Sequence, residues 1–232
     1  MSNSHVSLVT GGSSGIGAAL ARRLLVQGRR VAVTGRDPGR LAELAAELDT
    51  PDLLTLVADA GDHAATAEAV AATVERFGRL DAVVANAGYA LHDSVADGDP
   101  AAWDGMVRTN VLGPALLINA ALPQLTRSRG RIVLVGSVAG MVHTPGNLYG
   151  ATKWAVTGLA ENTRRLVTAD GVGVSLISPG RVDTAFWDPV GGAPAGGGLS
   201  AEQVADSIVW VLNQPEGVDV NTVTIRPLGA AV

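Results

Sequence analysis

The sequence contains no cysteine, and this absence removes one class of chemistry at once. Without thiols the chain forms neither disulfides nor thiolate metal sites. Its four histidines, His5, His63, His92 and His143, are scattered with no spacing typical of metal ligands. We therefore expect no metal site, and a chain without cysteine suits a reducing compartment such as the cytoplasm.

Long apolar runs and charge blocks are also missing. No segment approaches the roughly 18 consecutive apolar residues of a membrane helix, and the first ten residues, MSNSHVSLVT, lack the basic and apolar regions of a signal peptide. The net charge of -5, from 17 basic and 22 acidic residues, is spread along the chain. We expect a soluble protein that binds a small molecule and has no affinity for nucleic acid or membranes.

Aromatic side chains are scarce, at 3% of the chain, and only two residues are tyrosines. Hydrophobic residues nevertheless make up 47% of the 232 residues. That is enough to fill one core but hardly two, so we expect a single domain over residues 1–232.

Short β-rich apolar runs alternate with longer stretches of helical period. The predicted strands are VSLVT, RVAVTG, LLTLVA, LDAVVAN, RIVLVGS, GVSLIS and NTVTIRP. The predicted helices cover residues 15–28, 39–48, 63–77, 101–126, 148–169 and 201–213. Strands that alternate with helices are joined by right-handed crossovers. The pattern predicts a Rossmann-like, doubly wound α/β fold: a seven-stranded parallel sheet with helices on both faces.

A glycine-rich turn joins the first predicted strand to the first predicted helix. In VTGGSSGIGAAL the glycines Gly11, Gly15 and Gly17 follow the spacing G-x-x-x-G-x-G. Glycine permits positive φ and close backbone approach to a pyrophosphate, and the helix N-terminus offers free N–H groups to that charge. The turn predicts a dinucleotide site, although its spacing differs from the common G-x-G-x-x-G.

The end of the second strand, TGRDPG, indicates which dinucleotide binds. Arg36 favours the 2′-phosphate of NADP, whereas Asp37 favours the free ribose hydroxyl of NAD. Because Asp37 precedes Pro38 and a helix, we assign it to capping that helix. NADP(H) is therefore the preferred cofactor and NAD(H) the alternative.

Two further segments end strands beside the same predicted crevice. Asp59 either accepts a hydrogen bond from an adenine amino group or caps the next helix, and the sequence leaves both open. Asn86, Ala87 and Gly88 end the fourth strand with small residues. Close backbone approach to the cofactor is the functional interpretation, and a plain tight turn is the alternative.

The segment NLYGATKWA places Tyr149 four residues before Lys153, so that both side chains share one face of a helix. Lowering the pKa of a phenol from about 10 to about 7 takes about 4 kcal/mol. A cation about 4 Å away at an effective dielectric of about 20 supplies roughly that much, and an oxidised nicotinamide adds to it. We expect Tyr149 to act as a general acid and base at neutral pH.

Two more polar residues complete the candidate catalytic set. Ser137 ends the fifth strand and could hold a substrate carbonyl oxygen, while Asn110 could hold a water that links the lysine to solvent. Taken singly, each residue has a structural explanation, such as a turn serine, a helix break, a solvated lysine or a core tyrosine. Their joint occurrence behind a dinucleotide turn favours catalysis.

These residues resemble the classical short-chain dehydrogenase/reductase family over essentially the whole chain. The likeness is carried by TGGSSGIG at 10–17, NAG at 86–88, Asn110, Ser137, Tyr149, Lys153 and PGRVDT at 179–184. It implies an oxidoreductase acting on CH–OH groups with NAD(P). In such an enzyme Tyr149 exchanges the proton, Ser137 orients the oxygen, Lys153 holds the nicotinamide ribose and lowers the pKa of the phenol, and Asn110 completes a proton relay.

The resemblance also assigns the cofactor residues. They are Gly11, Ser13, Ser14, Gly15, Ile16, Gly17, Arg36, Asp59, Asn86, Ala87, Gly88, Tyr149, Lys153, Pro179, Gly180, Val182 and Thr184. Gly35 stands where NAD-preferring members carry an acid. Ser14 stands where some NADP-binding members have a second basic residue, so the NADP preference depends mainly on Arg36. The family commonly forms homotetramers through the two long helices, so we expect a homo-oligomer, either a tetramer or a dimer.

The substrate wall is predicted to be mostly apolar. Its candidates are Ser137, Val138, Met141, His143, Tyr89, Tyr149, Phe186 and Trp187. This wall suits a small to medium ketone or aldehyde, or the corresponding secondary alcohol. Arg181 could pair with a substrate carboxylate or form an ordinary surface ion pair. The glycine-rich residues 191–198 suggest a flexible lid near 184–199.

Two other functions share these features. A non-catalytic dinucleotide sensor or scaffold could use the same fold, but the intact set of Asn110, Ser137, Tyr149 and Lys153 argues against it. An epimerase or dehydratase of the same family shares the Tyr–Lys chemistry, but such relatives usually carry a longer chain. The substrate, the stereochemistry and the direction of the reaction are left open.

Overall fold

Strands and helices alternate along the chain in the computed structural model, which describes residues 5–193 and 196–229. The strands are β1 (Val6–Thr10), β2 (Arg30–Gly35), β3 (Leu53–Val57), β4 (Ala82–Ala85), β5 (Arg131–Val135), β6 (Gly173–Pro179) and β7 (Thr222–Ile225). The α-helices are α1 (Gly15–Val26), α2 (Pro38–Leu48), α3 (His63–Phe77), α4 (Pro100–Val107), α5 (Gly113–Ser128), α6 (Leu148–Val167) and α7 (Ala201–Leu212).

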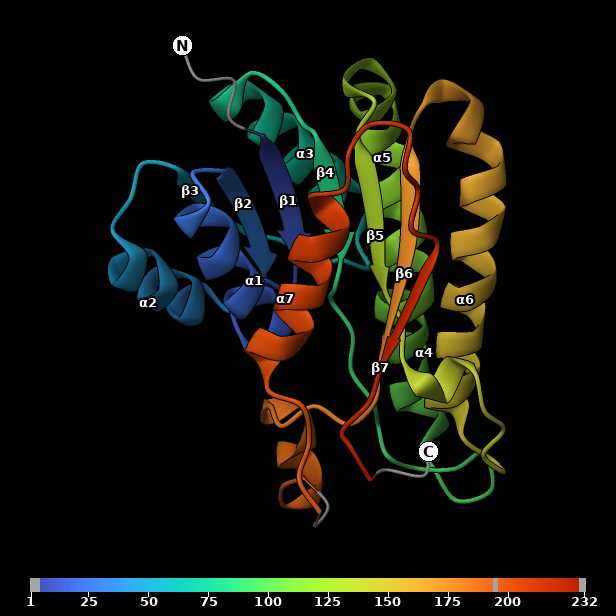
Figure 1. Cartoon of the computed structure of the whole chain (residues 1–232). Helices are drawn as coiled ribbons and strands as arrows, with labels where there is room; N and C mark the ends of the chain where they lie inside the picture. The colour runs from blue at the N-terminus through green and yellow to red at the C-terminus, as the bar shows by residue number, and fades with distance from the viewer. Residues whose placement is uncertain (1–4, 194–195, 230–232) are drawn as a thin grey trace.

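The seven strands form one parallel sheet in the order β3-β2-β1-β4-β5-β6-β7 (Figure 1). Chain order reverses between β1 and β4, which pair directly, Leu8 opposite Val83. In sheets of this kind ligands bind beyond the carboxyl ends of the strands at such a reversal. The predicted doubly wound, single-domain Rossmann-like fold is confirmed.

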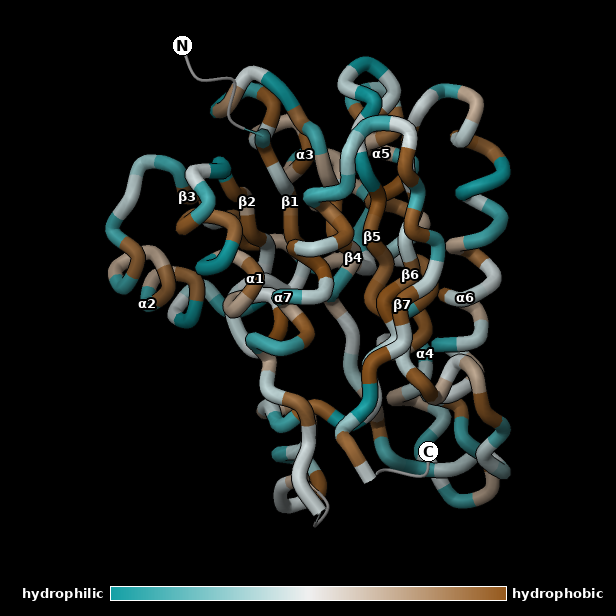
Figure 2. The backbone as a smooth tube through the Cα atoms, viewed as in Figure 1, coloured by the Kyte–Doolittle hydropathy of each residue, from teal (hydrophilic) through white to brown (hydrophobic). Residues whose placement is uncertain are grey.

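Successive side chains of each strand point to opposite faces, and both faces are buried. Val9 and Val33 belong to one apolar cluster, while Leu8 and Ala32 belong to the other. Hydrophobic residues follow the strands at the centre of the molecule in Figure 2, and hydrophilic ones lie mainly on the outer helix faces and loops. Strands buried on both sides therefore read as continuous apolar runs.

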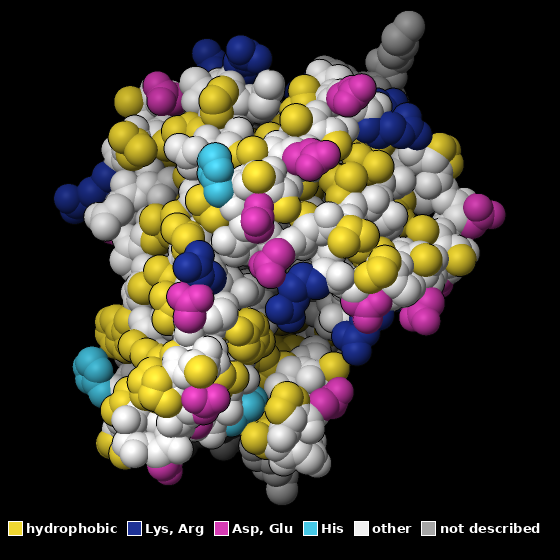
Figure 3. All heavy atoms as spheres, turned by 180° about the vertical axis from the view of Figure 1, so that it is seen from behind, with side chains coloured by type: hydrophobic (Ala, Val, Ile, Leu, Met, Phe, Trp, Pro, Cys, Tyr) yellow, Lys and Arg dark blue, Asp and Glu magenta, His cyan; other side chains and the backbone are white. Residues whose placement is uncertain are grey.

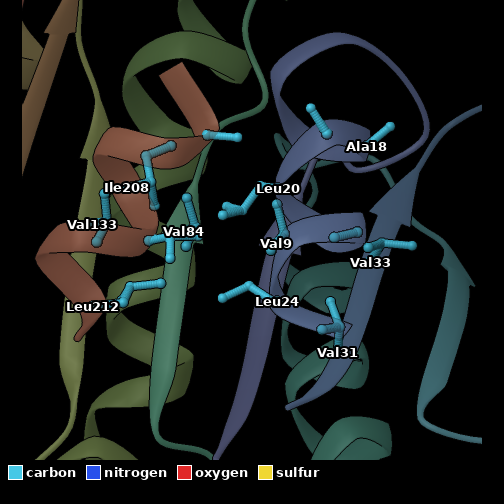
Figure 4. Packing of buried hydrophobic residues seen from close by; sticks show 14 of the residues in the cluster. Val9, Ala18, Leu20, Leu24, Val31, Val33, Val84, Val133, Ile208 and Leu212 are labelled. Carbon is cyan, nitrogen blue, oxygen red and sulfur yellow. The ribbon is translucent and has the colours of Figure 1, made fainter. Parts of the chain in front are cut away.

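Helices cover each face of the sheet. Figure 4 shows Leu20 and Leu24 of α1 beside Ile208 and Leu212 of α7, packed over Val84 and its neighbours. The opposite face is covered by α3, α5 and α6, which contribute residues such as Val70, Leu117 and Val156. Burying both faces is what makes a parallel sheet stable.

Aspartates begin several of the helices. The side chain of Asp37 accepts hydrogen bonds from the N–H groups of Gly39 and Arg40, at 2.8 and 3.2 Å, as predicted. Asp62, rather than Asp59, caps α3 by accepting from the N–H of Ala65. The capping alternative for Asp59 was therefore wrong, because Asp59 instead accepts from the N–H of Gly61 in a local turn.

The long helix predicted for residues 101–126 is not continuous. A π-helical turn, η1 (Arg108–Leu112), separates α4 from α5. Pro114 has no N–H, so the carbonyl of Asn110 four residues earlier lacks its α-helical donor. The N–H of Gly113 bonds to the oxygen of Arg108 instead. Apolar periodicity continues across this break, which is why the sequence pattern did not reveal it.

Among the described residues, no helix has the length and apolar character needed to cross a membrane. The described part of the chain also contains no group of three or more potential metal ligands. On the face seen from behind, acidic and basic side chains are interspersed with apolar ones (Figure 3).

Candidate active site

A cleft of about 900 Å³ opens at the carboxyl ends of the strands. Its lining runs from the glycine-rich turn after β1, past Arg36 after β2 and Asn86 after β4, to Ser137 after β5 and Tyr149 on α6. The β6–α7 segment contributes the remaining side, including Phe186. The cleft therefore joins the predicted dinucleotide site to the predicted catalytic residues.

The glycine-rich turn is held in a form that side chains would obstruct. Gly11 has φ +63° and Gly15 has φ +50°. A Cβ on Gly11 would lie 2.9 Å from the Cα of Ala87, and a Cβ on Gly17 would collide with the carbonyl oxygen of Gly11. Gly17 itself is not among the residues that line the cleft, and its contact with a cofactor stays a prediction. Its role is to let α1 pack against the turn.

Thr10 ties this turn to the end of β4. Its hydroxyl oxygen accepts from the N–H groups of Asn86 and Ala87, each at 3.1 Å. The Asn86 amide in turn donates to the carbonyl oxygens of Thr10 and Gly11, at 2.9 and 3.1 Å. Asn86 thus braces the two strand ends from inside the turn while also lining the cleft.

The end of the cleft beside β2 is basic. Arg36 is exposed there, and its guanidinium carbon lies 5.8 Å from the centre of the Tyr89 ring. Arg40 lies beside it and forms an ion pair with Asp37 at 3.6 Å. Because Asp37 is engaged with Arg40 and with the start of α2, the acid that could favour a free ribose hydroxyl already has partners. Tyr89 lines the cleft at this end, and its contact with substrate stays a prediction.

At the other end, Tyr149 and Lys153 lie on the same face of α6, as their spacing predicts. The Nζ of Lys153 lies 5.7 Å from the centre of the Tyr149 ring and donates to the carbonyl oxygen of Val135 at 2.9 Å. Lys153 is 6% exposed. A Cβ on Gly88 would lie 3.5 Å from Nζ, so Gly88 leaves open the space beside the ammonium.

Burial, not the neighbouring charge, dominates the titration of this pair. It raises the pKa of Tyr149 to about 12, opposed by a hydrogen bond with Ser137. Burial also lowers the pKa of Lys153 to about 8. The expected acidic phenol depends on Lys153 together with an oxidised nicotinamide, so in the protein by itself burial sets the pKa of Tyr149 and the effect of the bound cofactor stays a prediction.

Ser137 contacts Tyr149 directly, whereas Asn110 is held by Tyr89 and Thr152. The Ser137 hydroxyl oxygen accepts from the N–H of Ala139 at 3.1 Å, in addition to its bond with Tyr149. Asn110 is almost fully buried in η1. Its amide donates to the carbonyl oxygen of Tyr89 at 2.8 Å and to the hydroxyl of Thr152 at 3.1 Å, and its side-chain oxygen accepts from the N–H of Tyr89 at 3.0 Å.

Fewer of the predicted substrate residues line this end of the cleft than the sequence suggests. Val138, Phe186 and Trp187 line the cleft with Ser137 and Tyr149. Met141 and His143 are not among the lining residues, and their contact with substrate stays a prediction. His143 stacks on Trp154 at 5.2 Å, and the sulfur of Met141 accepts from the Thr224 hydroxyl at 3.5 Å. Both residues follow the short 3-10 turn η2 (Val138–Gly140) after Ser137.

Most predicted cofactor residues meet in the one cleft. They are Gly11, Ser13, Ser14, Gly15, Ile16, Arg36, Asp59, Asn86, Ala87, Gly88, Tyr149, Lys153, Pro179, Gly180, Val182 and Thr184. The lining also contains Arg40, His92, Thr144 and Asn147, which sequence reasoning missed. The sequence did contain a signal for Arg40, because it is a basic residue only four positions after Arg36. His92 offered none, because it reaches the cleft through contacts far away in the sequence.

Comparison with known proteins identifies the family. The family model for short chain dehydrogenase matches residues 5–193. The chain belongs to the short-chain dehydrogenase family. This short-chain dehydrogenase is 38% identical to an uncharacterized oxidoreductase of Staphylococcus saprophyticus, over 96% of this chain and 97% of that protein. An uncharacterized oxidoreductase of Staphylococcus aureus is 32% identical over 96% of this chain and 97% of that protein.

Solved structures of other family members share the architecture. An alcohol dehydrogenase from Thermococcus sibiricus, complexed with 5-hydroxy-NADP, has a TM-score of 0.89, is 28% identical and covers 97% of both chains. The closed form of a serine dehydrogenase complexed with NADP+ has a TM-score of 0.90, is 30% identical and covers 98% of this chain and 96% of that one. Like these relatives, this short-chain dehydrogenase is an oxidoreductase.

Proposed function

We propose that this short-chain dehydrogenase uses NADP(H) to transfer hydride between the nicotinamide and a small to medium, mostly apolar ketone or aldehyde, or the corresponding secondary alcohol. The observation that carries this proposal is the cluster of Tyr149, Lys153 and Ser137 at one end of a cleft whose other end is formed by the glycine-rich turn and Arg36. Such a cleft supports the proposal, because a proton donor and a dinucleotide could occupy one cavity.

The lining fits the dinucleotide on two grounds. Gly11 lets the turn after β1 lie directly against Ala87, and Gly88 leaves room beside Asn110 and Lys153, so the exposed backbone of these segments suits a pyrophosphate and a nicotinamide ribose. Arg36, at the end of the cleft beside β2, suits the 2′-phosphate, which carries about 1.5 to 2 negative charges near neutral pH. NADP or an NADP analogue is bound in the similar structures described above, which supports the same preference here.

The chain's own residues handle the proton. When bound, the dinucleotide supplies or accepts the hydride. Ser137, already hydrogen-bonded to Tyr149, orients the substrate oxygen beside the phenol. In reduction Tyr149 donates its proton to that oxygen, and in oxidation it takes the proton back. Lys153 can return a proton to the phenolate near neutral pH because burial lowers its pKa to about 8.

The test is nicotinamide absorbance during incubation with a panel of ketones, aldehydes and secondary alcohols, run with NADPH and with NADH. We expect turnover with NADPH and a loss of about 100- to 10,000-fold in Y149F. Y89F is the matched control, because Tyr89 lies at the Arg36 end of the cleft and is expected to keep most of the activity. Equal turnover by Y149F and the wild type would contradict the role of Tyr149.

The same panel separates the other functions. A protein that binds NADPH but oxidises it with no carbonyl compound would be a dinucleotide sensor or scaffold. An epimerised or dehydrated sugar product without net redox turnover would indicate the other branch of the family. Assembly as a homotetramer or dimer, a flexible lid near 184–199 and a cytoplasmic location stay predictions, and residues 194 and 195 of that lid lie outside the described residues.

A further inference from the structure

His92 adopts a backbone conformation that non-glycine residues rarely take. Its φ is +57°, and the other non-glycine residues with positive φ among those described are Asp49 and Arg129. Both of these end helices, where the left-handed conformation is common. His92 lies in the irregular segment between β4 and α4, away from any helix end. Such strain persists only where surrounding contacts impose it.

The contacts of the His92 ring supply the cause. The ring meets Phe186 edge-on at 5.2 Å and lies 5.1 Å from Trp187. Its Nε2 is 3.3 Å from the carbonyl oxygen of Phe186, a distance at which an Nε2–H can donate. These contacts join the β4–α4 segment to the short helix η4 (Ala185–Val190), 94 residues further along the chain.

The same contacts bring aromatic rings to the reacting end of the cleft. Phe186 lies 5.6 Å from the Tyr149 ring, and Trp187 packs edge-on against Phe186 at 5.2 Å. The indole N–H of Trp187 is held by the carbonyl oxygen of Val182 at 2.9 Å. All of these residues line the cleft, and η4 has no buried residue of its own. The rings therefore face the cleft rather than fill the core.

We propose that His92 is a positioning residue that holds Phe186 and Trp187 beside Tyr149, and that the aromatic subsite formed by these four rings selects carbonyl substrates bearing a flat, unsaturated ring. The inference rests on the proposed function and names the substrate class of the same site. The chain has eight aromatic residues of the types Trp, Tyr and Phe, and three of them, Tyr149, Phe186 and Trp187, lie in this subsite.

The physical basis is the charge distribution of aromatic rings. Aromatic pairs in edge-to-face or offset geometry attract one another beyond what buried area provides. A saturated ring of the same size gains the apolar burial but lacks the negative face and positive edge. A flat ring should therefore bind better than a puckered one of equal length and carbon count.

The test compares two ketones that differ only in that ring, 4-phenylbutan-2-one and 4-cyclohexylbutan-2-one. In the wild type we expect kcat/KM with NADPH to favour the phenyl ketone by about 3- to 10-fold. In H92A and H92G this preference should fall to near parity. H92A removes the ring but keeps the strained backbone, whereas H92G removes both, so equal loss in the two variants assigns the effect to the ring.

His143 gives the matched control, because its ring also stacks on a tryptophan but lies outside the cleft. H143A should keep the wild-type preference. F186L keeps apolar volume and removes the ring, so it tests the subsite even where a His92 variant does not fold. A general loss of stability would lower turnover of both ketones equally and leave their ratio unchanged. Loss of the preference only in the His92 and Phe186 variants supports the inference.

Calorimetric titration of both ketones into the protein saturated with NADP+ runs in parallel and needs no turnover. If neither these ketones nor any member of the carbonyl panel is turned over, the proposed function fails, while tighter binding of the phenyl ketone still supports the subsite. Equal affinity of the two ketones in the wild type, or an unchanged preference in H92A, H92G and F186L, would overturn the inference.

Discussion

The Nζ of Lys153 lies 2.9 Å from the carbonyl oxygen of Val135, and this hydrogen bond fixes a buried ammonium at the end of β5. The bond ties α6, which carries Tyr149, to the sheet. Lys153 is also the sole lysine of the sequence, the other 16 of the 17 basic residues being arginines. Its titration can therefore be followed without interference from other lysines.

The first prediction concerns stability against pH in protein free of nucleotide. Burial lowers the pKa of Lys153 to about 8 from an ordinary value of 10.5. Between these values the unfolded chain binds more protons than the folded one, so the stability contributed by Lys153 rises with pH and is lost as pH falls through about 8. The unfolding free energy of the wild type should increase by about 2 kcal/mol relative to K153M between about pH 7 and about pH 9.5.

Urea unfolding of both proteins at several pH values measures this difference. Incorporation of 13C-labelled lysine gives one lysine signal, whose pH dependence reports the pKa directly. A pKa near the ordinary lysine value, with parallel stability curves for the wild type and K153M, would show that burial does not control the ammonium.

The second prediction concerns the Tyr149 phenol. Burial raises its pKa to about 12, so the phenol should stay protonated through ordinary working pH in the free protein. Saturation with NADP+ should lower that pKa, because the oxidised nicotinamide is cationic, whereas NADPH should lower it far less. The ultraviolet phenolate absorbance of the wild type minus that of Y149F measures the change. The same pKa with both forms of the dinucleotide would remove the cation from the explanation.

The third prediction concerns the close approach of β1 to β4. G11A forces a side chain into positive φ and places its Cβ 2.9 Å from the Cα of Ala87. G28A is the matched control, because Gly28 also has positive φ but a Cβ there would meet nothing within 4 Å beyond its chain neighbours. G28A should destabilise by about 1 to 2 kcal/mol from backbone strain alone. G11A should cost clearly more and should also abolish measurable NADPH binding.

Denaturant unfolding and fluorescence titration of NADPH measure the two effects. Equal stability of the two variants, with dinucleotide affinity intact in G11A, would mean that the contact with Ala87 relaxes without consequence.

The fourth prediction concerns Arg36. Its replacement in R36A should weaken NADPH binding by about 10- to 100-fold, the range expected for hydrogen bonds to a charged group, and should leave NADH binding nearly unchanged. R40A should have a smaller effect, because Arg40 is already paired with Asp37. The ratio of the two dissociation constants is the measurement. An equal loss of affinity for NADH would show that the guanidinium does not contact the 2′-phosphate.

The fold followed from local patterns that need no tertiary information. Apolar runs such as RIVLV and the aspartate before Pro38 mark a buried strand and a helix start wherever they occur. The sequence pattern did not reveal the π-turn at Asn110, because helical apolar periodicity continues through it. The positions of Met141 and His143 relative to the cleft could not be read from composition, because the direction of a chain after a strand depends on a short turn.

The sequence by itself determined the order of strands and helices, the open glycine-rich turn and the shared helix face of Tyr149 and Lys153, because each depends on residues a few positions apart. Only the tertiary structure decided that Lys153 bonds to Val135, that the pKa of Tyr149 rises, and that His92 meets Phe186. These outcomes depend on burial and on contacts between distant segments, which come into existence only when the sheet and its helices pack together.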